Sequence, residues 1–518
     1  MPADDKVCES SQADDYQFEL KSDLESLDDR KLAVAELRSL TGADDDLEFG
    51  AATSISIKIP RGVIDISMLR SRLAFWKAAR LAQLCSNDRA NTDITQSLAL
   101  EATAKMKPAW KTLGEKAAIP AVEARGILAL SDKPSPALRK KNEYLSHPFH
   151  KYKAKFFPRL ARSLINVTCP DREQIILDPF SGSGTSCVEA SLMGMSSIGL
   201  DIDPLSVFIS KIKANLQDID LRGAMSAYFE LVSSINSGNQ ASLWNKGGNY
   251  EFRLPSFLIK RRPKRLPPEL ITEIEREIGY IRGEIFGIEE ENVKDLFLMV
   301  LSHAIATKLS LRWMGTGDDR FALEVATRPL SKIFVSHAKM VIDKLVVYQD
   351  LRSAGVVPAP GHASISVAEA SKLPLPDELV DGIVTSPPYL PAASGRETYL
   401  RSRASSIMAL NLMTEKEILD TETRILGSIL AKVTVETANV PSDVVELAAW
   451  MRPQRERTAK ADPTIAYFEN LRACLGEMRR VLKRGGRAAL VVSKEHTFWE
   501  LTSRRIIRKF DMSKAVTE

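Results

Sequence analysis

Short apolar runs that alternate with helical stretches dominate the chain from about residue 140 onward. The runs lie beside glycine- or proline-rich turns, as buried strands of a parallel sheet do; they are Ile175–Asp178, Ser197–Leu200, Gly382–Thr385 and Arg487–Ser493. Apolar positions that recur at helical spacing predict helices between them, over 186–194, 204–215, 268–285, 293–311, 330–350 and 464–482. This alternation predicts an α/β fold with a doubly wound parallel sheet.

The first 135 residues follow a different pattern. The stretch 54–59 (SISIKI) alternates apolar and polar residues and predicts a half-buried strand, whereas the spacing over 68–84 predicts an amphipathic helix. Residues 1–50 are rich in aspartate and serine. We therefore expect an acidic, mobile leader over 1–50, with one helix at 28–40, and a small, mostly helical module over 51–135.

Charge is distributed unevenly along the chain. The net charge of +4 averages a leader with 15 acidic and 5 basic residues against a remainder with 52 acidic and 66 basic residues. A basic body of this kind indicates a polyanionic partner. The acidic leader then suggests a screen that weakens non-specific binding of DNA to the basic body.

Composition excludes several classes of protein. The shares of 44% hydrophobic and 27% charged residues are those of an ordinary globular chain. Five scattered cysteines form no CxxC pair, so we expect neither a disulfide framework nor a metal site. We see no apolar run of membrane-spanning length and no signal peptide, so we expect a cytoplasmic protein without a membrane partner.

A glycine-rich loop at 178–186 (DPFSGSGTS) stands directly between a predicted strand and a predicted helix. It lacks the lysine of a phosphate-binding P-loop and the third glycine of a dinucleotide fingerprint. Asp201 ends the next predicted strand, which suits a carboxylate that accepts from both hydroxyls of a ribose. The plainer alternative is a tight turn that needs glycine only for its backbone.

A second loop, Thr385-Ser386-Pro387-Pro388-Tyr389, follows another predicted strand. Two successive prolines fix the backbone and donate no hydrogen bonds, so neighbouring carbonyls and the serine hydroxyl can accept from one amine group. The tyrosine offers an aromatic face to a planar base. Ligands of open α/β sheets bind at this edge, although a proline-rich exit loop without chemistry is the alternative.

Together these segments resemble the amino-group DNA methyltransferases, which use S-adenosylmethionine and modify cytosine N4 or adenine N6. DPFSGSGT is similar to their cofactor loop, GLDIDP to their ribose-binding acid and TSPPY to their catalytic motif. The segment 147–158 looks like the one that lines their methionine pocket, and Glu369 stands where an acid would meet the adenine amine. The turn at 480–486 resembles the one before their fifth strand, so the resemblance covers about residues 146–496.

The resemblance implies a Rossmann-like methyltransferase sheet and the residues of its site. It assigns these residues to S-adenosylmethionine: Lys155, Phe156, Pro158, Asp178, Pro179, Phe180, Gly182, Gly184, Thr185, Asp201 and Glu369. It assigns catalysis to Ser386, Pro387, Pro388 and Tyr389. The implied reaction is direct methyl transfer to a flipped base without a covalent enzyme intermediate. Serine instead of aspartate at position 386 favours cytosine N4.

The long stretch between the ribose acid and Glu369 indicates an insertion. We expect the catalytic domain over 140–215 and 360–518, and a mostly helical target-recognition region over 216–359. One basic run in the insertion suits DNA phosphates; it comprises Lys260, Arg261, Arg262, Lys264 and Arg265. A solvated linker is the alternative. After the catalytic loop, Arg401 and Arg403 are further candidates for contacts with the DNA backbone.

The leading hypothesis is a site-specific DNA methyltransferase of a bacterial restriction–modification system that acts on cytosine N4 in double-stranded DNA. A cognate restriction endonuclease or another subunit is a candidate partner. The alternatives are an N6-adenine enzyme, an RNA base methyltransferase and a catalytically impaired DNA-binding subunit. The last is motivated by the 25 residues after Ser493, in which we expect one helix over 498–510 and little more.

Overall fold

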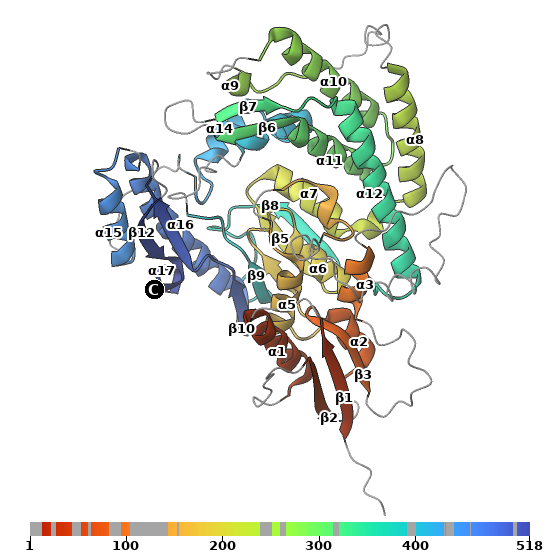
Figure 1. Cartoon of the computed structure of the whole chain (residues 1–518), viewed down its shortest axis with the longest axis vertical. Coiled ribbons are helices and arrows are strands. Elements are labelled where there is room, and N and C mark those ends of the chain that lie inside the picture. The colour runs from red at the N-terminus through yellow and green to blue at the C-terminus, as the bar shows by residue number, and fades with distance from the viewer. Residues whose placement is uncertain are drawn as a thin grey trace, which may run out of the picture.

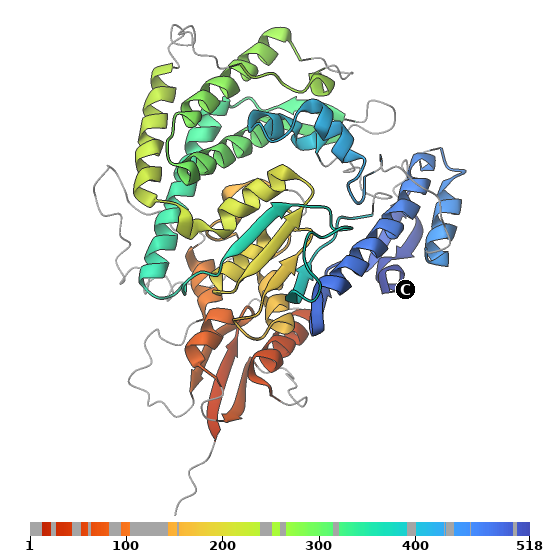
Figure 2. The same cartoon turned by 180° about the vertical axis from the view of Figure 1, so that it is seen from behind.

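The computed structural model describes residues 13–21, 27–43, 53–60, 64–81, 95–103, 143–152, 155–238, 251–259, 266–313, 321–390, 400–428, 430, 440–455, 457–500 and 505–517. A central sheet with flanking helices occupies the middle of the molecule, between an N-terminal unit and a helical layer (Figure 1). A C-terminal unit lies to one side, as the opposite view also shows (Figure 2).

The central sheet has five strands in the order β10-β9-β4-β5-β8, and every neighbouring pair is parallel. The strands are β4 (Ile176–Asp178), β5 (Ser197–Asp201), β8 (Ala363–Val367), β9 (Val380–Thr385) and β10 (Leu482–Leu490). The α/β class is therefore confirmed. The four predicted strands are present, although β10 begins earlier than expected, and β8 was not predicted. Because the strands are parallel, the loops that follow β4, β5, β8 and β9 meet at one edge.

Alternate residues of the strands face two different layers of helices. Ile176 packs with α5 (Pro158–Thr168) and α6 (Thr185–Leu192), which supply Ile165 and Ala190. The next residue, Leu177, packs on the other face with α16 (Thr458–Val481), which supplies Met478. Both faces of the sheet are thus covered at its centre, which explains why β4 is buried along its whole length.

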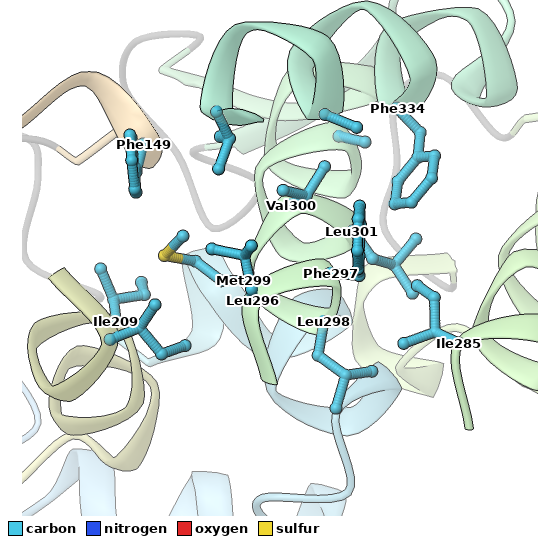
Figure 3. Close-up of a cluster of buried hydrophobic side chains, with 14 of the residues drawn as sticks. Phe149, Ile209, Ile285, Leu296, Phe297, Leu298, Met299, Val300, Leu301 and Phe334 are labelled. Carbon is cyan, nitrogen blue, oxygen red and sulfur yellow. The ribbon is translucent and has the colours of Figure 1, made fainter. Parts of the chain in front are cut away.

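The helical layer contains several long helices. It comprises α8 (Leu221–Gly238), α9 (Ser256–Ile259), α10 (Pro268–Phe286), α11 (Glu291–Lys308) and α12 (Leu330–Ser353), together with the hairpin β6 (Leu309–Trp313) and β7 (Phe321–Val325). The apolar side chains of α11 fill the space between two sets of neighbours (Figure 3). Ile285 and Phe334 lie on one side, and Ile209 of α7 (Pro204–Ala214) and Phe149 lie on the other (Figure 3). The layer therefore shares one core with the catalytic sheet.

The N-terminal unit differs from the expected helical module. Its three-stranded antiparallel sheet has the order β2-β1-β3, with β1 (Ala13–Leu20) at the centre, β2 (Ser54–Pro60) and β3 (Trp76–Leu81). The helices are α1 (Leu27–Thr41), α2 (Ile66–Arg72) and α3 (Gln96–Ala102). The predicted strand at 54–59 and the helix at 28–40 are confirmed. The other two predictions for this region need correction.

The helix predicted over 68–84 is wrong beyond Arg72, and part of the expected leader is the central strand. Trp76 begins β3, and its buried ring meets Phe18 of β1 edge-on at 5.7 Å. Pairing with β1, which lies some sixty positions earlier (Tyr16↔Leu81), overrides the local helical spacing. In β1 itself, Tyr16, Phe18 and Leu20 are buried, whereas acidic and amide residues fill the positions between them. The acidic composition concealed this alternation.

Buried polar contacts join the N-terminal unit to α5. The guanidinium of Arg72 donates to Asn166 Oδ1 at 2.8 Å, and Asn166 Nδ2 donates to Glu36 Oε1 at 2.6 Å. All three side chains are buried. Such groups are costly to bury unless they are paired with each other, so the interface specifies one relative orientation of the two units.

The C-terminal unit also corrects a prediction. Residues 495–499 (β11, Glu495–Trp499) and 506–511 (β12, Ile506–Asp511) form an antiparallel hairpin, followed by α17 (Met512–Thr517). The helix expected over 498–510 is therefore wrong. Phe498 and Phe510 are buried against α15 (Ser442–Met451) and α16. This packing favours strands, because it places one apolar face of the hairpin on the helices.

Within the described ranges, no helix combines the length and the apolar character that a crossing of the bilayer requires.

Candidate active site

The loop after β4 has the backbone that its glycines allow. Gly182 and Gly184 have φ values of 51° and 76°, in the left-handed region that favours glycine. A Cβ atom on Gly184 would lie 2.8 Å from Cβ of Ser210 in α7, and one on Gly182 would lie 3.3 Å from Oη of Tyr152. The loop is thus packed tightly against its neighbours, and α6 begins immediately after it at Thr185.

Asp201, at the end of β5, bonds directly to this loop. Its Oδ2 accepts from the N–H of Gly182 at 2.8 Å, and its Oδ1 accepts from the N–H of Asp203 at 2.9 Å. Burial, followed by the nearby charge of Asp203, raises the pKa of Asp201 to about 6. The predicted ribose-binding carboxylate therefore lies beside the predicted cofactor loop, in surroundings that tune its ionisation.

The glycine loop and β9 are joined through Asp178. Thr385 Oγ1, at the end of β9, donates to Asp178 Oδ1 at 2.6 Å, and the N–H of Phe180 donates to the same oxygen at 3.2 Å. Burial raises the pKa of Asp178 and outweighs these hydrogen bonds. The two loops that the sequence singled out are adjacent at the carboxyl edge of the sheet.

The proline-rich loop is held by hydrogen bonds from two other elements. The hydroxyl of Ser386 donates to the carbonyl of Val491 at 3.1 Å, and Tyr467 Oη of α16 donates to the carbonyl of Pro388 at 2.8 Å. Pro387 is buried, whereas the side chain of Tyr389 is 46% exposed. The backbone of the loop is therefore fixed while the aromatic ring remains accessible to a ligand.

The described residues of the segment 147–158 are 147–152 and 155–158, and their side chains have varied surroundings. Lys155 Nζ donates to the carbonyl of His147, and burial lowers the lysine pKa. Phe156 packs in the apolar cluster of α5 and α6, and Pro158 occupies the first turn of α5. Phe157, which we did not select, is 65% exposed. The cofactor roles of Lys155, Phe156 and Pro158 stay predictions.

Glu369 follows β8, on the far side of β5 from the glycine loop. Its carboxylate forms an ion pair with Arg424, and both side chains are partly exposed. Exposure and salt weaken such a pair, so a ligand amine could replace the guanidinium at modest cost. The adenine-binding role of Glu369 stays a prediction, and Arg424 is a neighbour that the sequence did not reveal.

Comparison with known proteins supports the resemblance to DNA methyltransferases. The model of a DNA methylase family, the N6/N4 methyltransferases, matches residues 87–211, which contain the glycine loop and Asp201. The chain is 24% identical over 408 residues to the Type II methyltransferase M.MvaI of Kocuria varians, an alignment that covers 73% of this chain and 83% of the relative. It is also 24% identical over 299 residues to the Type II methyltransferase M.BsoBI of Geobacillus stearothermophilus, covering 52% and 53% of the two chains. The family model and these two relatives support an amino-group DNA methyltransferase.

A shorter match concerns a different class of relative. Over 45 residues the methyltransferase chain is 51% identical to a tRNA (guanine(10)-N2)-dimethyltransferase of Pyrococcus abyssi, which covers 9% of this chain and 13% of the relative. A match of this length indicates a shared local motif. A methyltransferase also needs a methyl donor, and the cofactor role of the glycine loop and Asp201 stays a prediction.

Two of the residues predicted to contact DNA are described, and one of them is placed unexpectedly. The guanidinium of Arg403 lies 2.6 Å from Asp203 Oδ2 and its side chain is only 18% exposed, so it turns into the protein instead of toward DNA. The physical reason is the adjacent pair of acids at positions 201 and 203, which attracts a cation. Arg401 lies 6.0 Å from the ring of Phe257 and stays a candidate for DNA contact. The basic run at 260–265 lies outside the described residues.

Several residues around the site were missed by sequence reasoning. Asp203 caps α7 by accepting from the N–H of Leu205 at 2.9 Å, and its position before Pro204 is a recognisable helix-start signal. Tyr152 lay inside the segment that we compared with the methionine pocket. Tyr467 carries no such signal, because it lies 79 residues from the carbonyl that it contacts.

Proposed function

We propose that this methyltransferase transfers a methyl group from S-adenosylmethionine to the N4 amine of a flipped cytosine in double-stranded DNA. We further propose that it acts at a specific sequence, as the modification enzyme of a bacterial restriction–modification system, in which a cognate endonuclease is a candidate partner. The observation that carries the choice of chemistry is the hydrogen bond of Ser386.

Ser386 is oriented as a hydrogen-bond acceptor. A hydroxyl has one proton, and Ser386 donates it to the carbonyl of Val491 at 3.1 Å. Its oxygen lone pairs are then available for one N–H of an exocyclic amine, beside the carbonyls of the rigid proline loop. Accepting from the amine directs the nitrogen lone pair out of the base plane, where it can attack a methyl carbon. Tyr389, which is 46% exposed, offers a stacking face for the base.

The residues around the glycine loop fit S-adenosylmethionine. Asp201 supplies a carboxylate for the ribose hydroxyls, and the loop offers backbone N–H groups at the start of α6. Ser181 Oγ and Thr185 Oγ1 are buried, and neither has a hydrogen-bond partner among the described residues, which suits polar groups of a ligand. When bound, the cofactor supplies a methyl group on a positively charged sulfur that leaves as a neutral thioether.

The cysteines support direct transfer to the amine. Burial raises the pKa of Cys169 to about 11 and those of Cys187 and Cys474 to about 12. At neutral pH these three groups are thiols, which are poor nucleophiles. The protein then contributes positioning, polarisation of the amine and exclusion of water, and the amine loses a proton as it gains the methyl group.

Transfer of a tritium-labelled methyl group to duplex DNA, followed by nucleoside analysis, tests this proposal. We expect label in N4-methylcytosine, and Ser386→Ala should abolish it while sparing cofactor binding. Ser237→Ala is the matched control, because this exposed serine bonds only within α8, to the carbonyl of Ser233. Label in N6-methyladenine would redirect the target base. Tight DNA binding without label would favour a catalytically impaired DNA-binding subunit. The hairpin β11–β12 weakens that alternative, because the alternative was motivated by the expectation of one helix and little more after Ser493.

A guanine-N2 RNA methyltransferase is the second candidate. The local match to the tRNA (guanine(10)-N2)-dimethyltransferase is the observation that favours it. The longer alignments to Type II methyltransferases favour DNA. Offering tRNA and duplex DNA in the same reaction distinguishes the two, since each product is identified by its methylated nucleoside.

A further inference from the structure

Arg403 connects three segments that meet at the glycine loop. Its Nη1 lies 2.6 Å from Asp203 Oδ2 and donates to Ser206 Oγ at 3.0 Å. Its guanidinium carbon lies 5.0 Å from the centre of the Tyr152 ring. One side chain thus contacts the N-terminus of α7 and the segment before α5. It comes from the 3-10 helix Arg401–Arg403, which follows the catalytic loop in sequence.

We propose that Arg403 is a positioning residue of the cofactor pocket, which keeps the Asp201 carboxylate ionised and holds Tyr152 against the glycine loop. This inference rests on the proposed function, because it assumes that Asp201 binds the ribose of the cofactor. It replaces the contact with the DNA backbone that the sequence suggested for Arg403.

The electrostatic part of the argument concerns two neighbouring acids. Asp201 and Asp203 are linked by the N–H of Asp203, and the carboxylate of Asp203 disfavours the ionisation of Asp201. Arg403 is the cation that opposes this effect at Asp201. Tyr152 also faces the pair, but it is neutral near pH 7, since burial raises its pKa. His150, on the same segment, is neutral as well, with a pKa lowered to about 3.

Two other ionisable side chains near the pocket are bonded elsewhere. Glu369, after β8, is engaged with Arg424, and Lys213 of α7 donates to the carbonyl of Ser183 at 2.6 Å. Removing the charge of Arg403 should therefore raise the pKa of Asp201 further above 6. At neutral pH more of Asp201 would then be a carboxylic acid, which cannot accept from both hydroxyls of a ribose.

The geometric part of the argument concerns Tyr152. Its Oη shares a hydrogen bond with Ser206 Oγ at 2.9 Å and borders Gly182, while its ring lies below the guanidinium of Arg403. A cation stacked on an aromatic ring fixes the plane of that ring. Arg403 therefore holds the wall that Tyr152 forms beside the glycine loop.

The backbone around Arg403 has other anchors, so its side chain can be tested without removing the helix. The carboxylate of Glu422, in α14 (Glu415–Glu422), accepts from the N–H groups of Leu400 at 2.8 Å and Arg401 at 3.1 Å. Ala404 and Ile407 of α13 (Ala404–Ala409) are buried in the core shared with α11. We expect the Arg403→Met variant to fold.

The test is calorimetric titration of the full-length protein with S-adenosylmethionine between pH 5.5 and 9. If Arg403→Met raises the pKa of Asp201 by about one unit, binding should weaken about twofold at pH 7 and about eightfold at pH 5.5, and it should regain affinity as the pH rises, because the ionised fraction falls steeply only below the pKa. Arg403→Lys keeps the charge and should retain most of the affinity. Lys339→Met removes a cation from a distant pair with Asp343 in α12, and should leave the pH profile unchanged.

A charge rescue separates positioning from a structural role. Asp203→Asn removes one acid but keeps an oxygen that can cap α7, so the double variant Arg403→Met/Asp203→Asn should return toward the wild-type pH profile. A Met variant with the wild-type profile, or a double variant without rescue, would overturn the inference. If Arg403→Met does not fold, Asp203→Asn alone must shift the midpoint of the pH dependence of S-adenosylmethionine affinity to lower pH. Wild-type protein that binds no S-adenosylmethionine would instead refute the proposed function.

Discussion

Replacing Glu189 by glutamine should lower the free energy of unfolding by about 3 kcal/mol at pH 7, although we propose no role for Glu189 in methyl transfer. Glu189 is buried in α6, and its carboxylate is the centre of three hydrogen bonds. Arg162 Nε donates to Oε2 at 2.6 Å, and Tyr144 Oη and His147 Nε2 both donate to Oε1 at 2.7 Å. The carboxylate joins α5, α6 and the segment that precedes the cofactor loop.

The magnitude follows from the pKa of this carboxyl group. The charge of Arg162 and the two other donors outweigh burial and lower the pKa of Glu189 from 4.5 to about 2. At about 1.4 kcal/mol for each unit, ionised Glu189 stabilises the folded state by about 3 kcal/mol. Because the folded value is the lower one, this stabilisation is present above pH 4.5 and is lost as the pH falls toward 2. The same interaction viewed from Arg162 gives a similar magnitude, because leaving a buried guanidinium without its counter-charge costs about 3–5 kcal/mol in other proteins.

A second buried glutamate provides the matched control. Glu36 of α1 lies at the interface with α5, and burial, opposed by weaker hydrogen bonds and by the charge of Lys21, raises its pKa to about 7. The sign is opposite to that of Glu189: the contribution of Glu36 to stability is complete below pH 4.5 and is lost as the pH rises through 7. Glutamine resembles the protonated acid, so Glu36→Gln should change stability by less than about 1 kcal/mol at pH 6.

Urea denaturation at pH 6 and pH 7, followed by far-ultraviolet circular dichroism, compares the two variants. We expect Glu189→Gln to unfold at a lower urea concentration than wild type at both pH values. Glu36→Gln should unfold at a urea concentration near that of wild type at pH 6. Equal losses of stability for the two variants would refute the reasoning, since burial of the side chain, and not its charge, would then determine the loss. A Glu189 variant as stable as wild type would show that Arg162 finds another partner.

Three further predictions concern the site and its neighbours. Cofactor affinity of the wild-type protein should fall as the pH drops through about 6, because the pKa of Asp201 is raised to about 6 and the ribose needs the ionised form; a flat calorimetric profile from pH 5.5 to 7.5 would contradict this. Tyr467→Phe removes the hydrogen bond to the carbonyl of Pro388 and should lower kcat about tenfold with the cofactor Kd unchanged; a comparable loss in both would indicate misfolding instead. Deleting residues 1–50 removes β1 and α1, so the truncated protein should lose thermal stability as well as the proposed acidic screen; an unchanged melting temperature would show that the N-terminal sheet is dispensable.

Local signals were sufficient where function depends on contiguous residues. The glycine loop after β4, the acid after β5 and the proline loop after β9 could each be placed from a short strand and the turn beside it. Parallel pairing then brings their ends together, which the alternation of strands and helices already implied. The strand β8 was missed because ASISV has few apolar residues and is largely exposed at the edge of the sheet.

The parallel sheet and the two loops proposed to act in methyl transfer could be placed from the sequence alone, because their signals lie within a few neighbouring residues. Contacts between distant residues depend on the folded chain. Trp76 lies in a strand because β1 pairs with it, and residues 495–511 form a hairpin because α15 and α16 accept its apolar face. Arg403 turns inward because folding concentrates two carboxylates in front of it. The secondary structure of these segments and the orientation of this side chain depend on charges and surfaces that become neighbours only when the chain has folded.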